Sequence, residues 1–176
     1  MNRRKYLAGV AAVLGGSAAG CLEANGESTT MDYETHGLRH HEPVIEGGVP
    51  LADAPPEDER TVHLVTTEAG TDRFDESVLD EEATAFVEET DFSAAYLLVV
   101  GTYLGSTAAT VEVTSVEQSD DRATARVDVT YPSAGDTAIA YETTLVRVSL
   151  DGEATPDSAS VTFDLDGTEK TVTTQE

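Results

Sequence analysis

The chain has 176 residues and carries 34 acidic against 10 basic side chains, for a formal net charge of -24 at pH 7. This length accommodates one domain with its tails, and the single cysteine excludes an internal disulfide framework and a cysteine-rich metal site. So acidic a surface repels phosphate backbones, which excludes nucleic acid as a partner.

The N-terminus has the features of an export signal. Arg3 and Arg4 are followed, after one residue, by Tyr6 and Leu7, an arrangement that resembles the twin-arginine consensus. The weakly apolar stretch that comes next has about 13 residues, too few to span a bilayer, which takes about 20. We therefore expect residues 1–20 to be a twin-arginine signal peptide, and the resemblance implies export of an already folded domain.

A lipid attachment site follows this signal. Small residues at positions 17–20 lead directly to Cys21, and the segment resembles a lipobox, with Ala18 in place of the usual leucine. The alternative is an apolar N-terminus followed by a chance cysteine. We expect Cys21 to be the first residue of the mature chain and to carry a lipid thioether, which anchors the protein to membrane lipid on the extracellular face of the cell membrane.

The charge of the mature chain indicates the solvent. Removal of residues 1–20 removes three basic residues and no acidic one, which leaves 34 acidic against 7 basic residues and a net charge of -27. Such self-repulsion destabilises a compact domain at ordinary salt but is screened at molar salt, where the Debye length is about 3 Å. The composition resembles that of extreme halophiles, chiefly haloarchaea. An acidic interaction protein from a low-salt organism is the alternative, although the acids are spread along the whole chain.

Residues 21–59 are predicted to form a flexible acidic tether. The segment is rich in glycine and proline, shows no sustained apolar periodicity, and ends in a stiff, charged stretch at residues 55–59. As a flexible coil it would span roughly 34 Å.

Three histidines in this segment are the candidate metal ligands. His36 and His40 would share one face of a helix, and His41 or Glu42 could complete a set of the kind that binds Zn²⁺ or Cu²⁺. Gly37 and a following proline argue against a rigid helix, so we expect a solvated tether with no bound metal or other cofactor.

The domain is predicted to begin at residue 60. Residues 61–67 are rich in β-branched types and predict a first strand, while apolar residues at helical spacing predict one or two short helices over residues 72–89. Residues 96–103 form a nearly continuous apolar run, which predicts a central strand buried on both faces. His63, in the first strand, is expected to be a packed or edge histidine.

The remainder of the chain alternates in the manner of strands. Residues 110–116 and 123–131 flank a turn at Asp120-Asp121, residues 141–150 form another strand, and residues 160–165 and 168–173 flank Asp166-Gly167, a hairpin turn signal. The Asp164–Gly167 stretch does not continue as a calcium loop, because positions six and twelve hold the wrong residues. The fold class predicted for residues 60–176 is mainly β: an antiparallel sandwich or open barrel with one short helical segment.

One resemblance covers about residues 60–150. Residues 90–93 before the Leu97–Val100 strand, Gly105, the alternating strands, a Pro-Gly region at 132–135 and Tyr141 are together similar to the C-terminal domain of PrcB-type protease complex subunits. Residues 107–110 stand where that family has Gly-Gly-Tyr. The resemblance implies a non-catalytic, accessory role in a surface protein complex.

No catalytic motif is recognisable in the sequence. It contains no Gly-x-Ser-x-Gly, Ser-x-x-Lys, His-Glu-x-x-His or glycine-rich phosphate loop, and carboxylate pairs are too common to be informative. We expect a non-catalytic envelope lipoprotein whose β domain binds or assembles with another surface protein. The alternatives are a solute- or metal-binding lipoprotein associated with a transporter, and a small hydrolase.

Overall fold

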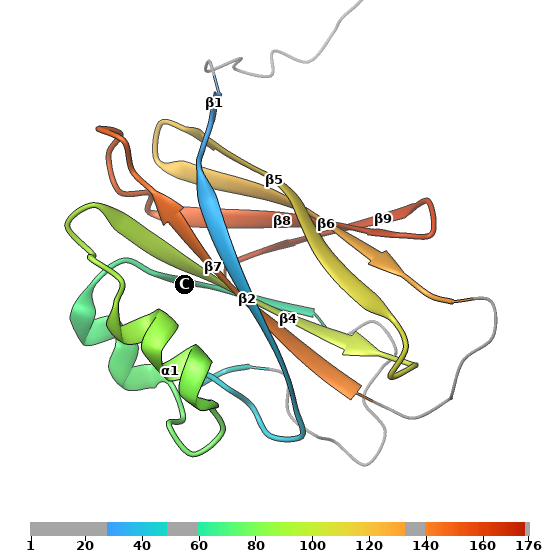
Figure 1. The fold of residues 1–176 in the computed structure, drawn as a ribbon. Coiled ribbons are helices and arrows are strands. Elements are labelled where there is room, and N and C mark those ends of the chain that lie inside the picture. Colours follow the sequence, from blue (N-terminus) through green and yellow to red (C-terminus); the bar gives the residue numbers. More distant parts are fainter. Residues whose placement is uncertain (1–27, 49–59, 133–139, 175–176) are drawn as a thin grey trace, which may run out of the picture.

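The computed structural model describes residues 28–48, 60–132 and 140–174 and shows two packed β-sheets (Figure 1). One sheet has the strand order β1-β5-β6-β8-β9, with bounds Thr29–Thr30, Thr110–Ser119, Arg122–Thr130, Ser158–Leu165 and Thr168–Thr173. The other has the order β2-β7-β4-β3, with bounds Tyr33–His40, Ala140–Ser149, Ala95–Leu104 and Arg60–Val65. The predicted mainly β fold is confirmed as a sandwich. Neighbouring strands are antiparallel except β6 and β8, which are parallel.

Both predicted hairpin turns are present. Asp120 joins β5 to β6 with φ at 47°, and Asp166 and Gly167 join β8 to β9 with φ at 49° and 90°. Two consecutive residues with positive φ match the right-handed twist of the flanking strands, which is why Asp-Gly is favoured there. The Asp164 carboxylate accepts a hydrogen bond from Gly167 N at 2.7 Å and holds the turn.

Strand β4 is covered on both faces, as predicted. Leu98 and Val100 belong to the core between the sheets, and Leu97 and Val99 belong to a second cluster on the outer face of the four-stranded sheet. All ten residues of β4 are buried. The second cluster exists because the chain between β3 and β4 folds back over this sheet.

That covering layer consists of a 3-10 helix, η1 (Glu68–Arg73), and one α-helix, α1 (Glu81–Glu88). The Asp80 side chain caps α1 by accepting a hydrogen bond from Ala83 N at 2.7 Å, and acidic residues in the first turn favour the same end. Ala83 and Val87 are the buried residues of α1 and lie in the second cluster. No helix in the described ranges is long and apolar enough to cross a membrane.

The predicted tether over residues 21–59 is wrong for residues 28–48, which belong to the domain. Strand β2 pairs with β7 along its whole length, from Tyr33 opposite Val148 to His40 opposite Tyr141. Leu38 and Ile45 are buried in the second cluster. The segment lacks a strong apolar pattern because β2 is an edge strand, whose backbone ladder to β7 supplies much of its stabilisation. The rest of the predicted tether, and the signal peptide, lie outside the described residues.

Candidate functional site

The sandwich has two long sides, and the N-terminal segment closes one of them. The chain leaves β1, in the five-stranded sheet, and enters β2, in the four-stranded sheet, through residues 31 and 32. Met31 N donates to Val116 O at 2.9 Å, and Ser149 N donates to Asp32 O at 3.0 Å, so this crossing is bonded to both sheets. We call the side formed by β2 and β5 the closed side.

Two side chains of β2 complete this closure. The Tyr33 hydroxyl donates to Val113 O at 3.0 Å. The Arg39 guanidinium donates to Ala109 O at 2.7 Å, to Thr107 O, and to the Glu142 carboxylate at 3.0 Å. Backbone carbonyls of β5 and of the residues just before it are therefore satisfied by side chains of the opposite sheet.

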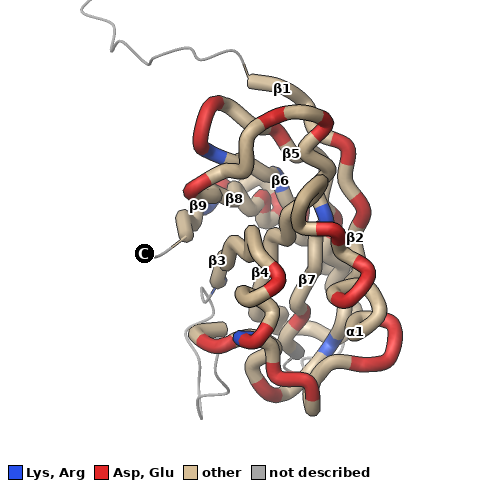
Figure 2. Tube along the Cα trace, turned by 90° about the vertical axis from the view of Figure 1, so that its left-hand side faces the viewer, with Lys and Arg blue, Asp and Glu red and all other residues tan. Residues whose placement is uncertain are grey.

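The other side, formed by β3 and β9, has no such closure. Within the described residues β3 pairs only with β4 and β9 only with β8, so each ends its sheet with a free backbone edge. In Figure 2 the two strands lie near each other on the left of the molecule, and β2 lies on the right. We call it the open side.

A groove follows the free edge of β3 on the open side. It consists of two adjoining depressions of about 400 and 530 Å³, which share Val62, His63 and Arg73. Its walls come from distant parts of the chain, and we define the β3 groove by residues 46–47, 60–64, 66, 73, 121–122, 156–158 and 172–174. The groove thus borders β3 along nearly its whole length.

The β3 groove contains an unusual share of the positive charge. Seven Lys and Arg side chains lie in the described ranges, and three of them, Arg60, Arg73 and Arg122, line the groove. Three others are bound to carboxylates elsewhere: Arg39 to Glu142, Arg126 to Glu169 and Arg147 to Glu34. In the half of the groove next to Arg60, two arginines face one carboxylate, Glu46. The groove as a whole is lined by three arginines and by three carboxylates, those of Glu46, Asp121 and Asp157.

The two arginines of this half are held differently. Arg60 points toward the interior, is 8 % exposed, and lies over the ring of Phe163 at 5.4 Å from its centroid. Arg73 is exposed, at the end of η1, and donates to Glu46 O and to His63 Nδ1, each at 3.3 Å. Arg73 thus donates to a carbonyl and an imidazole, neither of which carries a full negative charge.

His63 connects β3 to the outer layer. Burial, and next the charge of Arg73, lower the pKa of the imidazole, so the ring is neutral at pH 7 and Nδ1 can accept from Arg73. Gly47, at φ 77°, allows the backbone to approach this ring, since a Cβ there would lie 3.4 Å from His63 Cε1. The prediction of a packed or edge histidine is confirmed in both senses.

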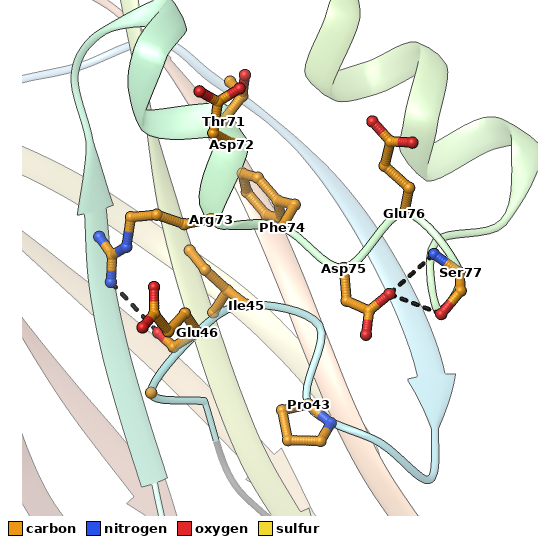
Figure 3. A pocket seen from close by; sticks show the side chains of 11 residues that line it. Pro43, Ile45, Glu46, Thr71, Asp72, Arg73, Phe74, Asp75, Glu76 and Ser77 are labelled. Carbon is orange, nitrogen blue, oxygen red and sulfur yellow. Dashed lines mark hydrogen bonds between the residues drawn. The ribbon is translucent and has the colours of Figure 1, made fainter.

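A larger depression adjoins this region and is acidic (Figure 3). It has a volume of about 870 Å³ and is lined by the carboxylates of Glu46, Asp72, Asp75 and Glu76. Asp75 accepts hydrogen bonds from the hydroxyl and backbone N–H of Ser77, at 2.6 and 3.0 Å, and these bonds lower its pKa. Asp75 therefore stabilises its own turn. The depression lies where residues 43–48 contact η1.

The three candidate metal ligands are separated. A helix over this segment is wrong because residues 33–40 form β2, and four residues along a strand place His36 and His40 about 13 Å apart. His36 Nε2 lies 3.5 Å from the Asp80 carboxylate, His40 Nε2 shares a hydrogen bond with Thr143 Oγ1 at 2.7 Å, and His41 is exposed. No group of three His, Cys, Asp or Glu residues in the described ranges is arranged to hold a metal ion.

The remaining predicted sites, Cys21, Arg3 and Arg4, lie outside the described residues. The β3 groove was not predicted at all. A signal for part of it exists in the sequence, where Arg60 starts the first predicted strand as one of the few cations of an acidic chain. Its other walls come from segments that the sequence alone does not bring together.

Comparison with protein-family models, curated proteins and solved structures found no match in any of the three. The likeness to PrcB-type subunits therefore stays a prediction.

Proposed function

We propose that the chain is a lipid-anchored, non-catalytic envelope protein whose β domain docks another surface protein along the open side of the sandwich. The observation that carries the proposal is the asymmetry of the two sides. The edge of one is bonded to the opposite sheet, whereas the edge of the other borders a groove lined by three of the seven Lys and Arg side chains of the described residues. A free edge strand is a common template for a partner, which can add a strand to it.

The anchor in this proposal rests on the sequence. The Arg3-Arg4 pair, the short apolar stretch and Cys21 after small residues have the order of an exported lipoprotein signal. Lipid attachment would hold the domain at the surface, where its partner is another envelope protein.

One contact in the described structure is of the kind that hydrolases use, and it supports a structural role instead. His40 shares a hydrogen bond with the Thr143 hydroxyl at 2.7 Å, as a base does with a nucleophile. Thr143 is only 5 % exposed, on a central strand, and His40 also stacks on Tyr141 with the ring centroids 6.4 Å apart. A hydroxyl so enclosed packs the sheet and does not meet a substrate.

The anchor is tested by fractionation. Cells that produce the wild-type chain or Cys21→Ser are separated into membrane and soluble fractions, and the variant should leave the membrane fraction. Arg3→Lys with Arg4→Lys should accumulate as uncleaved precursor. Equal distribution of wild type and Cys21→Ser would contradict the lipid anchor.

The docking surface is tested by photo-cross-linking in intact cells. A photoreactive amino acid replaces Thr61 on β3 or, as the matched control, the exposed Thr35 on β2. We expect a cross-linked envelope protein from position 61 and none from position 35. Cross-links of equal yield from both positions would contradict docking along the open side.

A further inference from the structure

His63 lies where three segments of the chain meet beside the β3 groove. Because Val62 and Leu64 point into the core between the sheets, His63 projects from the outer face of β3, and both depressions of the groove include it. Arg73, at the end of η1, bonds to the imidazole from one direction, and the backbone at Gly47 approaches it from another. The ring is only partly buried, so its surroundings depend on what covers the groove.

The hydrogen bond between Arg73 and His63 assigns the protonation state of the ring. A guanidinium can only donate, so His63 Nδ1, 3.3 Å from the Arg73 nitrogen, accepts with its lone pair, and the neutral ring carries its proton on Nε2. A second proton can be added only at Nδ1, the atom to which Arg73 donates. Uptake of that proton therefore breaks the hydrogen bond and leaves two cations facing each other.

No carboxylate is placed to stabilise a protonated His63. The other charged side chains that line the groove are Glu46, Arg60, Asp121, Arg122 and Asp157, and the adjoining acidic depression, which does not include His63, adds Asp72, Asp75 and Glu76. Within the described ranges, none of these carboxylates forms an ion pair with His63. Burial, and next Arg73, lower the pKa of the imidazole, and a backbone contact with Gly47 opposes them only in part.

A segment docked along β3 would cover this pair of side chains. A strand added to the free edge lies about 4.8 Å from β3, beside the His63 ring and the Arg73 guanidinium, since both line the groove. In the uncovered groove, water screens the repulsion between Arg73 and a protonated His63. Removal of this water strengthens the repulsion and adds a desolvation cost for the second charge. The covered groove therefore favours the neutral imidazole more strongly than the open groove does.

We propose that docking along the β3 groove is controlled by pH through His63, so that the partner binds while the imidazole is neutral and is released when Nδ1 takes up a proton. The inference rests on the proposed function and specifies how that docking is regulated. Binding and protonation are linked reciprocally, so a docked partner opposes protonation of His63 by the same factor by which protonation weakens docking.

The test measures photo-cross-linking from position 61 in intact cells that produce the full-length chain. The pH of the medium is lowered from 7.5 toward 5 at constant high salt, and the circular dichroism of the purified protein shows at which of these pH values it is folded. The quantity compared is the yield at the lowest such pH divided by the yield at pH 7.5. With His63 in place, this ratio should show a loss of about fivefold or more.

Three variants separate His63 from other effects of acid. His63→Gln presents an amide that can accept from Arg73 but takes up no proton, and its ratio should be close to one. Arg73→Gln removes the second cation, and its ratio should lie between one and that of the wild type. His40→Gln is the matched control, because burial also lowers the pKa of His40, which lies on the closed side, and it should keep the wild-type ratio.

Several results would overturn the inference. These are a wild-type ratio near one, a yield that rises on acidification, equal ratios in His63→Gln and His40→Gln, or an Arg73→Gln ratio equal to that of the wild type. Failure of the inference is distinguishable from failure of the proposed function. A strong cross-link at pH 7.5 whose yield does not depend on pH would refute the control by His63 and retain docking. Absence of any cross-link from position 61 at pH 7.5 would refute docking itself.

Discussion

The closed and open sides of the sandwich show two treatments of the same problem, the unpaired edge of a sheet. On the closed side the chain crosses between the sheets, and Tyr33 and Arg39 bond to carbonyls of the opposite edge. On the open side β3 and β9 end their sheets without such bonds among the described residues, and the groove beside β3 is lined by three arginines. The edge on one side is used for stability, and the edge on the other remains accessible.

The difference between the two sides predicts where substitutions should affect stability and where they should affect binding. Side chains that connect the two sheets contribute to the free energy of unfolding. An exposed cation beside a free edge, such as Arg73, contributes little to it, because its hydrogen bonds are long and it is solvated. The following predictions test this division, in order of decreasing effect.

Dilution of salt should unfold the whole domain, and with it both sides of the sandwich. Acidic residues lie all around the domain (Figure 2), and the Debye length grows from about 3 Å at 1 M to about 10 Å at 0.1 M salt. The circular dichroism of the chain without residues 1–20 should lose its β signal over this range. KCl in place of NaCl at equal ionic strength is the control and should preserve the signal. A melting temperature independent of salt would contradict the halophilic interpretation.

Truncation of the central strand should be costly on either face. Leu97→Ala and Leu98→Ala should each lower the free energy of unfolding by about 2–5 kcal/mol, because both side chains are fully buried, on opposite faces of β4. Denaturant unfolding in high salt measures both variants and sets the scale for the two edges. A cost well under about 1 kcal/mol at one of the two positions would contradict the doubly covered strand.

Removal of one arginine from each side should show directly how differently the two sides contribute to the free energy of unfolding. Arg39→Gln should cost about 1–2 kcal/mol, since Glu142, with its side chain 12 % exposed, and the carbonyls of Thr107 and Ala109 lose a donor. Arg73→Gln, on the open side, should cost under about 0.5 kcal/mol. The same unfolding measurement applies, and equal costs would remove the distinction between the two sides.

Acidification should lower the free energy of unfolding of the domain through one histidine on each side. Burial, and next Arg73, lower the pKa of His63, and burial is the main cause that lowers the pKa of His40, with nearby His41 a smaller one. Because the unfolded chain binds protons near the ordinary value of 6.5 and the folded chain does so only at lower pH, stability is constant above that value and falls as the pH drops below it.

The measurement is denaturant unfolding between pH 7.5 and 5 at constant high salt. His40→Gln and His63→Gln should each flatten the loss of stability below pH 6.5 relative to the wild type. Stability that rises on acidification would contradict the lowered pKa values.

The sequence predicted the centre of the fold better than its edges. The apolar run around Leu97 predicted a strand buried on both faces, and the Asp-Gly pair at Asp166 predicted a hairpin, because burial and positive φ leave local signatures. The parallel pairing of β6 with β8 has no local signature, since residues 131–157 separate the two strands.

The error over residues 28–48 has the same physical origin. Strand β2 contains Gly37, two histidines and few apolar residues, so its composition is typical of a loop. It is a strand because β7 offers it a complete backbone ladder and because Leu38 and Ile45 find apolar surface on the outer face of the sheet. Such stabilisation depends on tertiary partners, and so does the β3 groove, whose walls meet only in the folded domain.

The short length of chain before the crossing between β1 and β2 also limits the region in which the domain can meet a partner. Ser28, the first described residue, is only seven residue steps from Cys21, a length of chain that spans at most about 25 Å. Strands of ten residues extend over about 33 Å, so under the proposed anchoring the whole domain stays within roughly 60 Å of the lipid. The search is then confined to a thin layer and becomes two-dimensional diffusion along the membrane, in which even scarce neighbours meet often.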